Sequence, residues 1–472
     1  MRPAGKRFDL LVIGAGPAGQ KAAVQGAKAG CKVLLVERES GVGGECVHRG
    51  TIPSKTLRES AVYLAGLRRR AAELIERELG PQTKLESLMS RLDSMLERHR
   101  HFMGEQLERN GIELWRGRAR FVSPCEVDVA CTGGATWRAA AGVIVVATGS
   151  RPRRPPDVPV DHERILDSDS ILSMPYLPGS LTVLGAGVIA SEFASIFQTL
   201  GVRVTMIDRG ERPLPFLDAE LTGRFVSHFE RDGGRFVPCS RATRVACDSL
   251  GPVETTLDSG VVVRSEKVLV ALGRSACIQG LDLDAAGVAV NDRGFIAVDE
   301  NCRTSAPNVY AVGDVIGPPA LAASSMEQGR RAVRHALGLE LGPPSETVPI
   351  GVYTIPEMAS VGLSEADAVA REGAALVGRS RFAELARGQI NGDCEGLLKL
   401  VADPSGTRLL GAQIVGEGAT ELIHLAQLAL LGQLDVDAFV DNIFNFPTLA
   451  EGYRVAALEI AGKRAESLRA AG

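Results

Sequence analysis

The 472-residue sequence has few aromatic residues, no excess of basic charge and no long apolar run. Aromatic residues make up 4% of the chain, and the formal net charge is −4. Because nucleic-acid-binding proteins usually carry a basic face, we expect no nucleic-acid partner. No apolar run reaches the roughly 18 residues of a membrane-spanning helix. We therefore expect a soluble, cytoplasmic protein with no membrane partner.

Paired cysteine motifs are also absent, although the chain contains nine cysteines. None of them stands in a C-x-x-C pair, and their spacing is irregular. An odd number at irregular spacing fits neither a secreted disulfide framework nor a zinc site. We therefore predict no metal site, and we expect most of these cysteines to behave as small buried hydrophobic residues.

Glycine is abundant, and one glycine pattern stands at the beginning of the chain. Residues 14–19 have the pattern G-x-G-x-x-G, between an apolar run at 8–13 and a helical stretch at 20–29. A second apolar strand at 31–36 then ends at an acidic residue. In dinucleotide-binding units such glycines permit a tight turn and close approach of the pyrophosphate, and the acid binds a ribose hydroxyl. The candidate residues are Gly14, Gly16, Gly19 and Glu37.

The same pattern occurs a second time, in residues 185–190. A strand is predicted at 181–184, a helix at 191–200 and a second strand at 202–207, which again ends at an acid. Two units with the same spacing predict two dinucleotide sites on one chain. A second unit that kept the fold without a ligand would show the same pattern. The candidate residues are Gly185, Gly187, Ala190 and Asp208.

Three later segments end in glycine at positions that suit the same sheets. Residues 143–149 end in Thr148-Gly149, and residues 268–273 end in Gly273. Residues 304–314 lead to Gly313-Asp314, where the carboxylate could accept a hydrogen bond from a ribityl hydroxyl. That role would return the chain to the first nucleotide site, so we predict a discontinuous first domain with the second inserted into it.

These elements predict an α/β fold with two Rossmann-like dinucleotide-binding domains and a C-terminal α+β domain that serves association. The expected boundaries are 1–153 with 275–346 for the first domain, 154–274 for the second and 347–472 for the third. A long helical insertion is expected at 55–110. In the third domain we expect strands at 352–355, 397–401 and 409–415 and a helix at 419–431.

The stretch 41–56, GVGGECVHRGTIPSKT, resembles the redox-active segment of the flavin-dependent disulfide reductases. In that family two cysteines sit five positions apart and are followed by a proline, a small residue and a lysine. Here Cys46 is present and Lys55 follows in register, but the second cysteine is replaced by Thr51. A hydroxyl cannot form a disulfide, so dithiol exchange through this pair is excluded.

Nearly the whole chain resembles the two-dinucleotide-binding flavoproteins related to glutathione reductase and lipoamide dehydrogenase. The resemblance implies FAD in the first unit, NAD or NADP in the second and a homodimer, or a higher homo-oligomer, formed by the third domain. The residues implied to contact FAD are Gly14, Gly16, Gly19, Glu37, Lys55, Thr148, Gly149 and Asp314. Those implied to face the nicotinamide nucleotide are Gly185, Gly187, Ala190 and Asp208. The predicted cofactor-binding set is completed by Gly44, Cys46, Thr51, Gly273 and Gly313.

Two departures from the family pattern coincide. The disulfide lacks its partner at position 51, and Phe446 stands where the family has its catalytic histidine, although the orienting Glu451 is present. A phenylalanine cannot transfer protons. The resemblance implies that Lys55 and Glu192, the expected catalytic residues, lie as an ion pair beside the flavin. This combination is similar to the soluble FAD-containing pyridine nucleotide transhydrogenases, a subfamily that moves hydride reversibly between NADPH and NAD through the flavin.

This resemblance predicts ping-pong kinetics and one nucleotide site that accepts both NAD(H) and NADP(H). Asp208 favours a free ribose 2′-OH, whereas Arg209 and Arg212 could pair with a 2′-phosphate or could simply be solvated. Cys46 could be a packing residue beside the flavin or a thiolate of low pKa, and packing is favoured. Two alternatives remain for the function: an NAD(P)H:quinone reductase or diaphorase, and a non-catalytic FAD-binding relative of lipoamide dehydrogenase.

Overall fold

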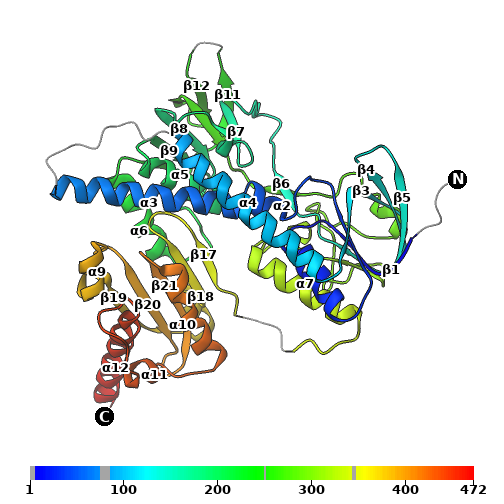
Figure 1. The fold of residues 1–472 in the computed structure, drawn as a ribbon. Coiled ribbons are helices and arrows are strands. Elements are labelled where there is room, and N and C mark those ends of the chain that lie inside the picture. Colours follow the sequence, from blue (N-terminus) through cyan, green and yellow to red (C-terminus); the bar gives the residue numbers. More distant parts are fainter. Residues whose placement is uncertain (1–5, 75–84, 249–250, 343–346, 472) are drawn as a thin grey trace.

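The computed structural model describes residues 6–74, 85–248, 251–342 and 347–471. Figure 1 shows three sheet-containing parts, with the N-terminal sheet at one side, the second sheet above and the C-terminal sheet below the long helix α3 (Thr51–Leu74). Helix α4 (Leu85–Arg109) packs along α3 and leads back to the N-terminal sheet. These two helices occupy the predicted insertion.

The N-terminal sheet has a parallel core in the order β3-β2-β1-β5-β16. Its strands are β1 (Lys6–Ile13), β2 (Val33–Glu37), β3 (Glu113–Ser123), β5 (Thr136–Val146) and β16 (Val309–Ala311). The outer halves of β3 and β5 continue past this core and pair antiparallel with β4 (Glu126–Cys131). Helices α1 (Pro17–Lys28) and α7 (Ala322–Ala336) pack against each other beside the core.

The second sheet repeats this plan, with parallel order β10-β9-β8-β14-β7. Its strands are β7 (Ile165–Asp167), β8 (Ser180–Leu184), β9 (Arg203–Ile207), β10 (Arg235–Val237) and β14 (Lys267–Val270). Helices α5 (Val188–Thr199) and α6 (Ala219–Arg231) flank it, and a separate antiparallel sheet consists of β11 (Ala242–Cys247), β12 (Val253–Leu257) and β13 (Val262–Ser265). The two connections to the first part, β6 (Ser150–Pro152) and β15 (Arg274–Ala276), pair with each other.

The C-terminal part is a five-stranded antiparallel sheet in the order β17-β18-β21-β20-β19. Its strands are β17 (Ile350–Val352), β18 (Met358–Gly362), β19 (Leu376–Arg381), β20 (Leu397–Ala402) and β21 (Leu409–Val415). Its helices are α8 (Glu365–Glu372), α9 (Ala386–Asn391), α10 (Ala419–Leu431), α11 (Asp437–Asp441) and α12 (Glu451–Ala471). The C-terminal part also contains the 3-10 turn η4 (Phe382–Glu384). Short elements in the other parts are α2 (Gly44–His48) and the 3-10 turns η1 (Ile171–Ser173), η2 (Leu283–Ala286) and η3 (Gly313–Ile316).

One expected strand is placed differently. The strand predicted at 352–355 ends at Val352, and the next strand begins at Met358. The backbone groups between them bond to side chains of other elements instead of extending the sheet: Thr354 O accepts from Arg58, and Ile355 N donates to Ser195. The apolar pattern of this segment therefore reflects a junction between parts of the molecule.

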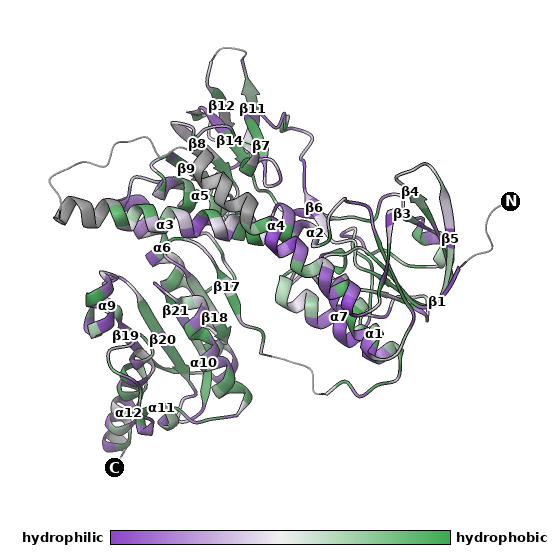
Figure 2. Cartoon of the chain, in the orientation of Figure 1, coloured by the Kyte–Doolittle hydropathy of each residue, from purple (hydrophilic) through white to green (hydrophobic). Residues whose placement is uncertain are grey.

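Burial explains why the continuous apolar runs of the two dinucleotide-binding units form parallel strands. All five residues of β2 are buried, as are all four of β14, and parallel strands covered on both faces need such continuous apolar runs. Figure 2 shows hydrophobic residues concentrated in the strands of the C-terminal sheet and many hydrophilic residues on α7. None of the helices in the described parts of the chain is long and apolar enough to cross a membrane.

The predicted fold class is confirmed: two α/β units of the same plan are followed by an α+β unit. The exact domain boundaries stay a prediction. The chain is expected to pass from the first domain to the second near β6 and to return near β15. Because these two strands pair with each other, both crossings lie at one place. That place lies beside the site described next.

Candidate active site

A cavity of about 1100 Å³ lies where the three parts of the molecule meet. Its walls come from the glycine loops after β1 and β8, from α2 and the start of α3, from the segments that follow β5 and β16, and from α10. Most small-ligand pockets have volumes of roughly 300–1,000 Å³. This cavity has the size for an extended ligand, and it lies at the carboxyl ends of parallel strands, where open α/β sheets bind nucleotides.

The first glycine loop is held by the acid that ends β2. Glu37 Oε2 accepts a hydrogen bond of 2.7 Å from Ala15 N, and its Oε1 accepts one of 2.9 Å from Glu39 N. A Cβ on Gly19 would overlap the carbonyl oxygen of Gly14, and one on Gly44 would lie 2.8 Å from the Cα of Gly16. These glycines are therefore needed for backbone contact between the loop, helix α1 and helix α2.

The second glycine loop repeats this arrangement. Asp208 Oδ2 accepts from Ala186 N at 3.0 Å, and its Oδ1 accepts from Gly210 N at 2.7 Å. A Cβ on Gly185 would lie 2.6 Å from the carbonyl oxygen of Ala271, whereas one on Gly187 would meet no atom within 4 Å. The open space at Gly187 faces the cavity, as expected for a glycine that admits a ligand.

The two arginines after Asp208 differ in their surroundings. Arg212 donates to the carbonyl oxygens of Leu217 and Pro215, each at 2.8 Å, and to Thr222 Oγ1 at 3.0 Å. Arg209 is exposed. The guanidinium of Arg212 thus holds its own loop, whereas the side chain of Arg209 is exposed to solvent.

Lys55 and Glu192 form an ion pair on the cavity wall. Lys55 Nζ lies 2.6 Å from Glu192 Oε2, and the carboxylate is nearly buried, with a side-chain exposure of 6%. Lys55 stands near the start of α3 and Glu192 in the middle of α5, so the pair joins the first part of the molecule to the second. The structure therefore contains the ion pair that the family resemblance implied.

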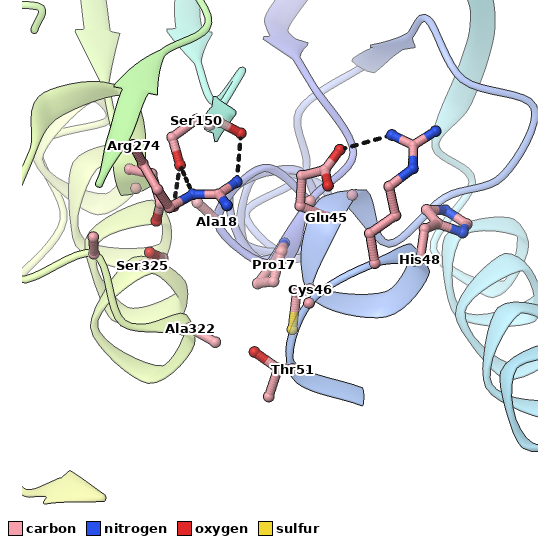
Figure 3. Close-up of a pocket in the computed structure, with 18 of the residues that line it drawn as sticks. Pro17, Ala18, Glu45, Cys46, His48, Thr51, Ser150, Arg274, Ala322 and Ser325 are labelled. Atoms are coloured by element: carbon pink, nitrogen blue, oxygen red, sulfur yellow. Dashed lines mark hydrogen bonds and ion pairs between the residues drawn. The ribbon is translucent and has the colours of Figure 1, made fainter. Parts of the chain in front are cut away.

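Cys46 and Thr51 face each other across the turn between α2 and α3, as Figure 3 shows. The Thr51 hydroxyl hydrogen-bonds with the Cys46 side chain. Burial raises the pKa of the Cys46 thiol, which outweighs the opposite effects of Thr51 and Lys55. The thiol therefore stays protonated at neutral pH, which favours packing over thiolate chemistry.

Phe446, which replaces the family's histidine, does not line the cavity of its own chain and is 75% exposed. It precedes α12, on the C-terminal part of the molecule. Glu451 Oε2 accepts from Thr448 N at 3.4 Å, so this carboxylate caps the turn that follows Phe446. No proton-transfer group stands at this position.

Sequence reasoning missed a polar chain in the wall of the cavity. Arg274 Nε donates to Ser150 Oγ at 2.7 Å, as Figure 3 shows, and Ser150 Oγ donates to Asp314 Oδ2 at 2.6 Å. Arg274 also donates to the carbonyl oxygen of Ser150 at 2.9 Å. Each of these residues directly follows a predicted glycine, so its place after a strand-ending glycine was the available signal.

Two acids were also missed, Glu45 and Asp169. Glu45 Oε1 pairs with Arg49 at 3.1 Å, while its Oε2 is buried and has no hydrogen-bond partner among the described residues. Burial raises the pKa of the Asp169 carboxyl to about 6, and the nearby negative charge of Glu45 adds to this. Both line the cavity, and their sequence context carries no motif that would have singled them out.

The structure brings most predicted site residues to this one cavity. Those that line it are Gly14, Gly16, Glu37, Gly44, Cys46, Thr51, Lys55, Thr148, Gly149, Gly187, Glu192, Gly273, Gly313 and Asp314. Those that do not are Gly19, Gly185, Ala190, Asp208, Arg209 and Arg212. Gly19 lies in α1, Gly185 in the second glycine loop and Ala190 in α5, whereas the last three residues follow β9.

Known relatives agree with this architecture. A family model described as "Pyridine nucleotide-disulphide oxidoreductase" matches residues 8–335, and the dimerisation domain of the same family matches residues 348–457, in agreement with the predicted homodimer. A protein of Mycobacterium tuberculosis named "Soluble pyridine nucleotide transhydrogenase" is 41% identical over 97% of this chain and 98% of its own. One of that name from Hahella chejuensis is 39% identical, over 96% and 98%.

Solved structures show the same fold. LpdA from Mycobacterium tuberculosis superposes with a TM-score of 0.89 at 29% identity, covering 96% of this chain and 99% of its own. The HOCl-induced flavoprotein disulfide reductase RclA from Escherichia coli gives a TM-score of 0.86 at 26% identity, with the same coverage. With its family-model match over both dinucleotide units and the C-terminal part, the chain belongs to the pyridine nucleotide-disulphide oxidoreductase family and is an oxidoreductase.

Proposed function

We propose that this enzyme is an FAD-dependent transhydrogenase that moves hydride reversibly between NADPH and NAD⁺ by a ping-pong mechanism, without a redox-active disulfide. The observation that carries the proposal is the Lys55–Glu192 pair on the wall of a cavity that two complete glycine loops share, with a threonine hydroxyl facing Cys46. The relatives named soluble pyridine nucleotide transhydrogenase, at 36–41% identity, support it.

The residues present fit FAD at the first glycine loop. Thr148 Oγ1 is buried at the cavity wall without a hydrogen-bond partner in the described structure, and a ligand would satisfy it. The N-terminus of α1 offers backbone N–H groups for a pyrophosphate, and Glu37 stands at the end of β2 for a ribose. Asp314, held by Ser150, would take the ribityl chain. When bound, the flavin supplies the centre that accepts and returns a hydride.

Four side chains on the cavity wall have distinct roles in this proposal. Lys55 places a positive charge on the cavity wall, where it would stabilise negative charge on a reduced cofactor. Glu192 holds this ammonium group in one position. Cys46 contributes a neutral, protonated thiol and Thr51 a hydroxyl, so neither takes electrons from a bound nucleotide. Hydride transfer requires orientation more than proton transfer, and the absence of a histidine at position 446 is compatible with it.

We infer that NAD(H) and NADP(H) bind in turn at the second glycine loop, with Gly187 against the pyrophosphate. Gly185 and Ala190 shape the loop, and Asp208, at the end of β9, would be the acid for the adenosine ribose. Because Arg212 holds its own loop, Arg209 is the better candidate for the 2′-phosphate of NADP(H).

We also infer a cytoplasmic location for the enzyme. All nine cysteines are unpaired in the structure, although several are exposed, which suits a reducing compartment.

The decisive experiment compares three acceptors with NADPH as the donor: a thio-substituted NAD analogue, a quinone and a lipoamide disulfide. Rapid turnover with the nucleotide acceptor, and none with the disulfide, is the expected result. Faster turnover with the quinone than with the nucleotide would make the enzyme a diaphorase. An FAD-loaded protein with no turnover on any acceptor would be a non-catalytic relative.

A further inference from the structure

Tyr353 lies at the junction of the three parts of the molecule and contacts both members of the Lys55–Glu192 pair. It directly follows β17, in the segment where the chain leaves the C-terminal sheet, which lies below α3 in Figure 1. It lines the cavity and is half-buried. Its contacts come from α3, α5 and α10, so its position depends on all three parts.

The first contact is with the glutamate. Tyr353 N donates to Glu192 Oε1 at 3.0 Å, while the other carboxylate oxygen, Oε2, receives Lys55 Nζ at 2.6 Å. Each oxygen of the buried carboxylate is therefore taken by one donor. The carboxylate cannot rotate away from Lys55 without losing the backbone bond from Tyr353.

The second contact is with the lysine. Lys55 Nζ lies 4.8 Å from the centroid of the Tyr353 ring, within the distance at which an aromatic face attracts an ammonium ion. A lysine side chain has a flexible stem of four carbons, so an ion pair with one carboxylate leaves its ammonium group considerable conformational freedom. The Tyr353 ring restricts the ammonium group of Lys55 on a second side. The ammonium group therefore lies between Glu192, the ring and the cavity.

Tyr353 is itself held in place by a chain of polar contacts. Its hydroxyl pairs with the side chain of Thr420, whose backbone N and Oγ1 donate to Glu357 Oε2 at 3.2 and 2.9 Å. Glu357 Oε1 lies 3.1 Å from Arg58, which also donates to the carbonyl oxygen of Thr354 at 3.0 Å. Arg58 stands one turn beyond Lys55 on α3, so the chain of contacts returns to the helix from which it began.

We propose that Tyr353 is a positioning residue: its backbone N–H and its ring fix the Lys55–Glu192 pair on the cavity wall, and Thr420 and Glu357 hold it there. The C-terminal part of the molecule thereby completes the site at which hydride is transferred. The inference rests on the proposed function, because it assigns Tyr353 a task in the reduction of a bound flavin by a nucleotide.

The test uses the full-length, FAD-loaded enzyme and three variants. Tyr353→Leu removes the ring, Tyr353→Phe removes only the hydroxyl, and Tyr176→Leu is the matched control. Lys267 Nζ lies 4.9 Å from the Tyr176 ring, so the same kind of contact is removed outside the cavity. Two quantities are measured: the rate of flavin reduction by NADPH in a stopped-flow instrument, and the midpoint potential of the bound flavin.

Tyr353→Leu should lower the limiting rate of flavin reduction about tenfold or more, because small misplacements of a catalytic group have effects of this size. The dissociation constant of NADPH should change less than about threefold, since the pair acts on the transition state. The midpoint potential should become more negative, because a displaced ammonium group stabilises added negative charge less well. Tyr353→Phe keeps the ring and the backbone N–H but loses the hydrogen bond to Thr420, so both quantities should lie between those of Tyr353→Leu and the wild type. Tyr176→Leu should leave both quantities unchanged.

A wild-type rate and potential in Tyr353→Leu would overturn the proposal, as would a loss confined to NADPH affinity. If the leucine variant does not retain FAD, Tyr353→Met fills more of the space without a ring and is measured in its place. Reduction of the bound flavin by NADPH, which this test measures, involves no second nucleotide. Wild-type enzyme that is reduced by NADPH but passes nothing to NAD⁺ would therefore refute the transhydrogenase proposal while the Tyr353 test still stands.

Discussion

At the scale of single residues, we propose that Arg209, and not Arg212, lets the enzyme distinguish NADPH from NADH. Arg209→Ala should raise the KM for NADPH about tenfold and that for NADH less than twofold, since only NADPH carries the 2′-phosphate. Arg212→Ala should impair both nucleotides alike, because Arg212 bonds to the carbonyl oxygens of its own loop. Steady-state kinetics with each nucleotide checks this. Equal losses for both nucleotides in Arg209→Ala would remove Arg209 from the site.

Asp169 makes the stability of the protein depend on pH in a defined direction. Burial raises its pKa from the ordinary 3.8 to about 6, so the folded state binds a proton more tightly than the unfolded state does. Above pH 6 the charged carboxylate destabilises the fold, and this effect fades as the pH falls towards 4. Asp169→Asn should therefore raise the unfolding temperature by about 1–3 °C at pH 7.5.

The gain from Asp169→Asn should shrink when the unfolding temperature is measured at successively lower pH, and it should be absent near pH 4. Asp157→Asn, on an exposed aspartate in the neighbouring segment, is the control and should shift nothing at either pH. A stabilisation by Asp169→Asn that is the same at pH 7.5 and pH 4 would contradict this account of the carboxyl.

At the scale of elements, the glycine loops separate structural glycines from ligand-facing ones. Gly187→Ala adds a methyl group where no atom lies within 4 Å, so the fold should be kept. The same methyl group would stand where the pyrophosphate approaches, and nucleotide affinity should fall about tenfold or more. Calorimetric titration with NADP⁺ measures the affinity, and thermal unfolding measures the fold.

Gly185→Ala, two residues earlier, should do the opposite. Its φ of 108° is unfavourable for alanine, and the new Cβ would lie 2.6 Å from the carbonyl oxygen of Ala271. Strain of this kind costs about 1–3 kcal/mol, so the unfolding temperature should fall. A Gly187→Ala variant that unfolds as early as Gly185→Ala would contradict the division between the two positions.

These loops also show what the sequence could predict. In each unit the glycines, the acid that ends the second strand and the two flanking strands lie within one short segment of the chain. Their spacing was therefore enough to predict the loop. Tyr353 and Glu192 meet across 161 positions and Arg58 and Thr354 across 296, and no spacing rule joins them. For the same reason the sequence could not predict the pairing of Arg274, Ser150 and Asp314, although each of them follows a predicted glycine. The strand expected at 352–355 was wrong because that segment's backbone bonds to other parts of the molecule.

At the scale of the whole molecule, a buried lysine joins the second sheet-containing part to the C-terminal part. Lys399, on β20, is 3% exposed, and its Nζ lies 2.9 Å from Asp218, 3.3 Å from Glu220 and 2.7 Å from Glu365. Asp218 also caps α6. Arg379 also pairs with Glu220 and Glu365, at 3.0 and 3.1 Å. Lys399→Met would therefore leave the nearly buried Asp218 carboxylate without its cation, and removing one partner of a buried ion pair costs about 3–5 kcal/mol.

Thermal unfolding of Lys399→Met should therefore begin several degrees lower than in the wild type. Lys6→Met is the comparison, because Lys6 pairs with Glu113 at the surface, where the lysine is 48% exposed and such pairs contribute about 0–1 kcal/mol. Equal shifts in the two variants would show that the Lys399 cluster does not hold the two parts together.

For the whole molecule, we propose that one site receives two nucleotides in turn and that no thiol or histidine takes part. The most direct measurement is the initial rate of hydride transfer from NADPH to the thio-substituted NAD analogue, with both concentrations varied below any substrate inhibition. Double-reciprocal plots should give parallel lines, because the first product leaves before the second substrate binds. Intersecting lines would show that both nucleotides are bound at once and would contradict the shared site.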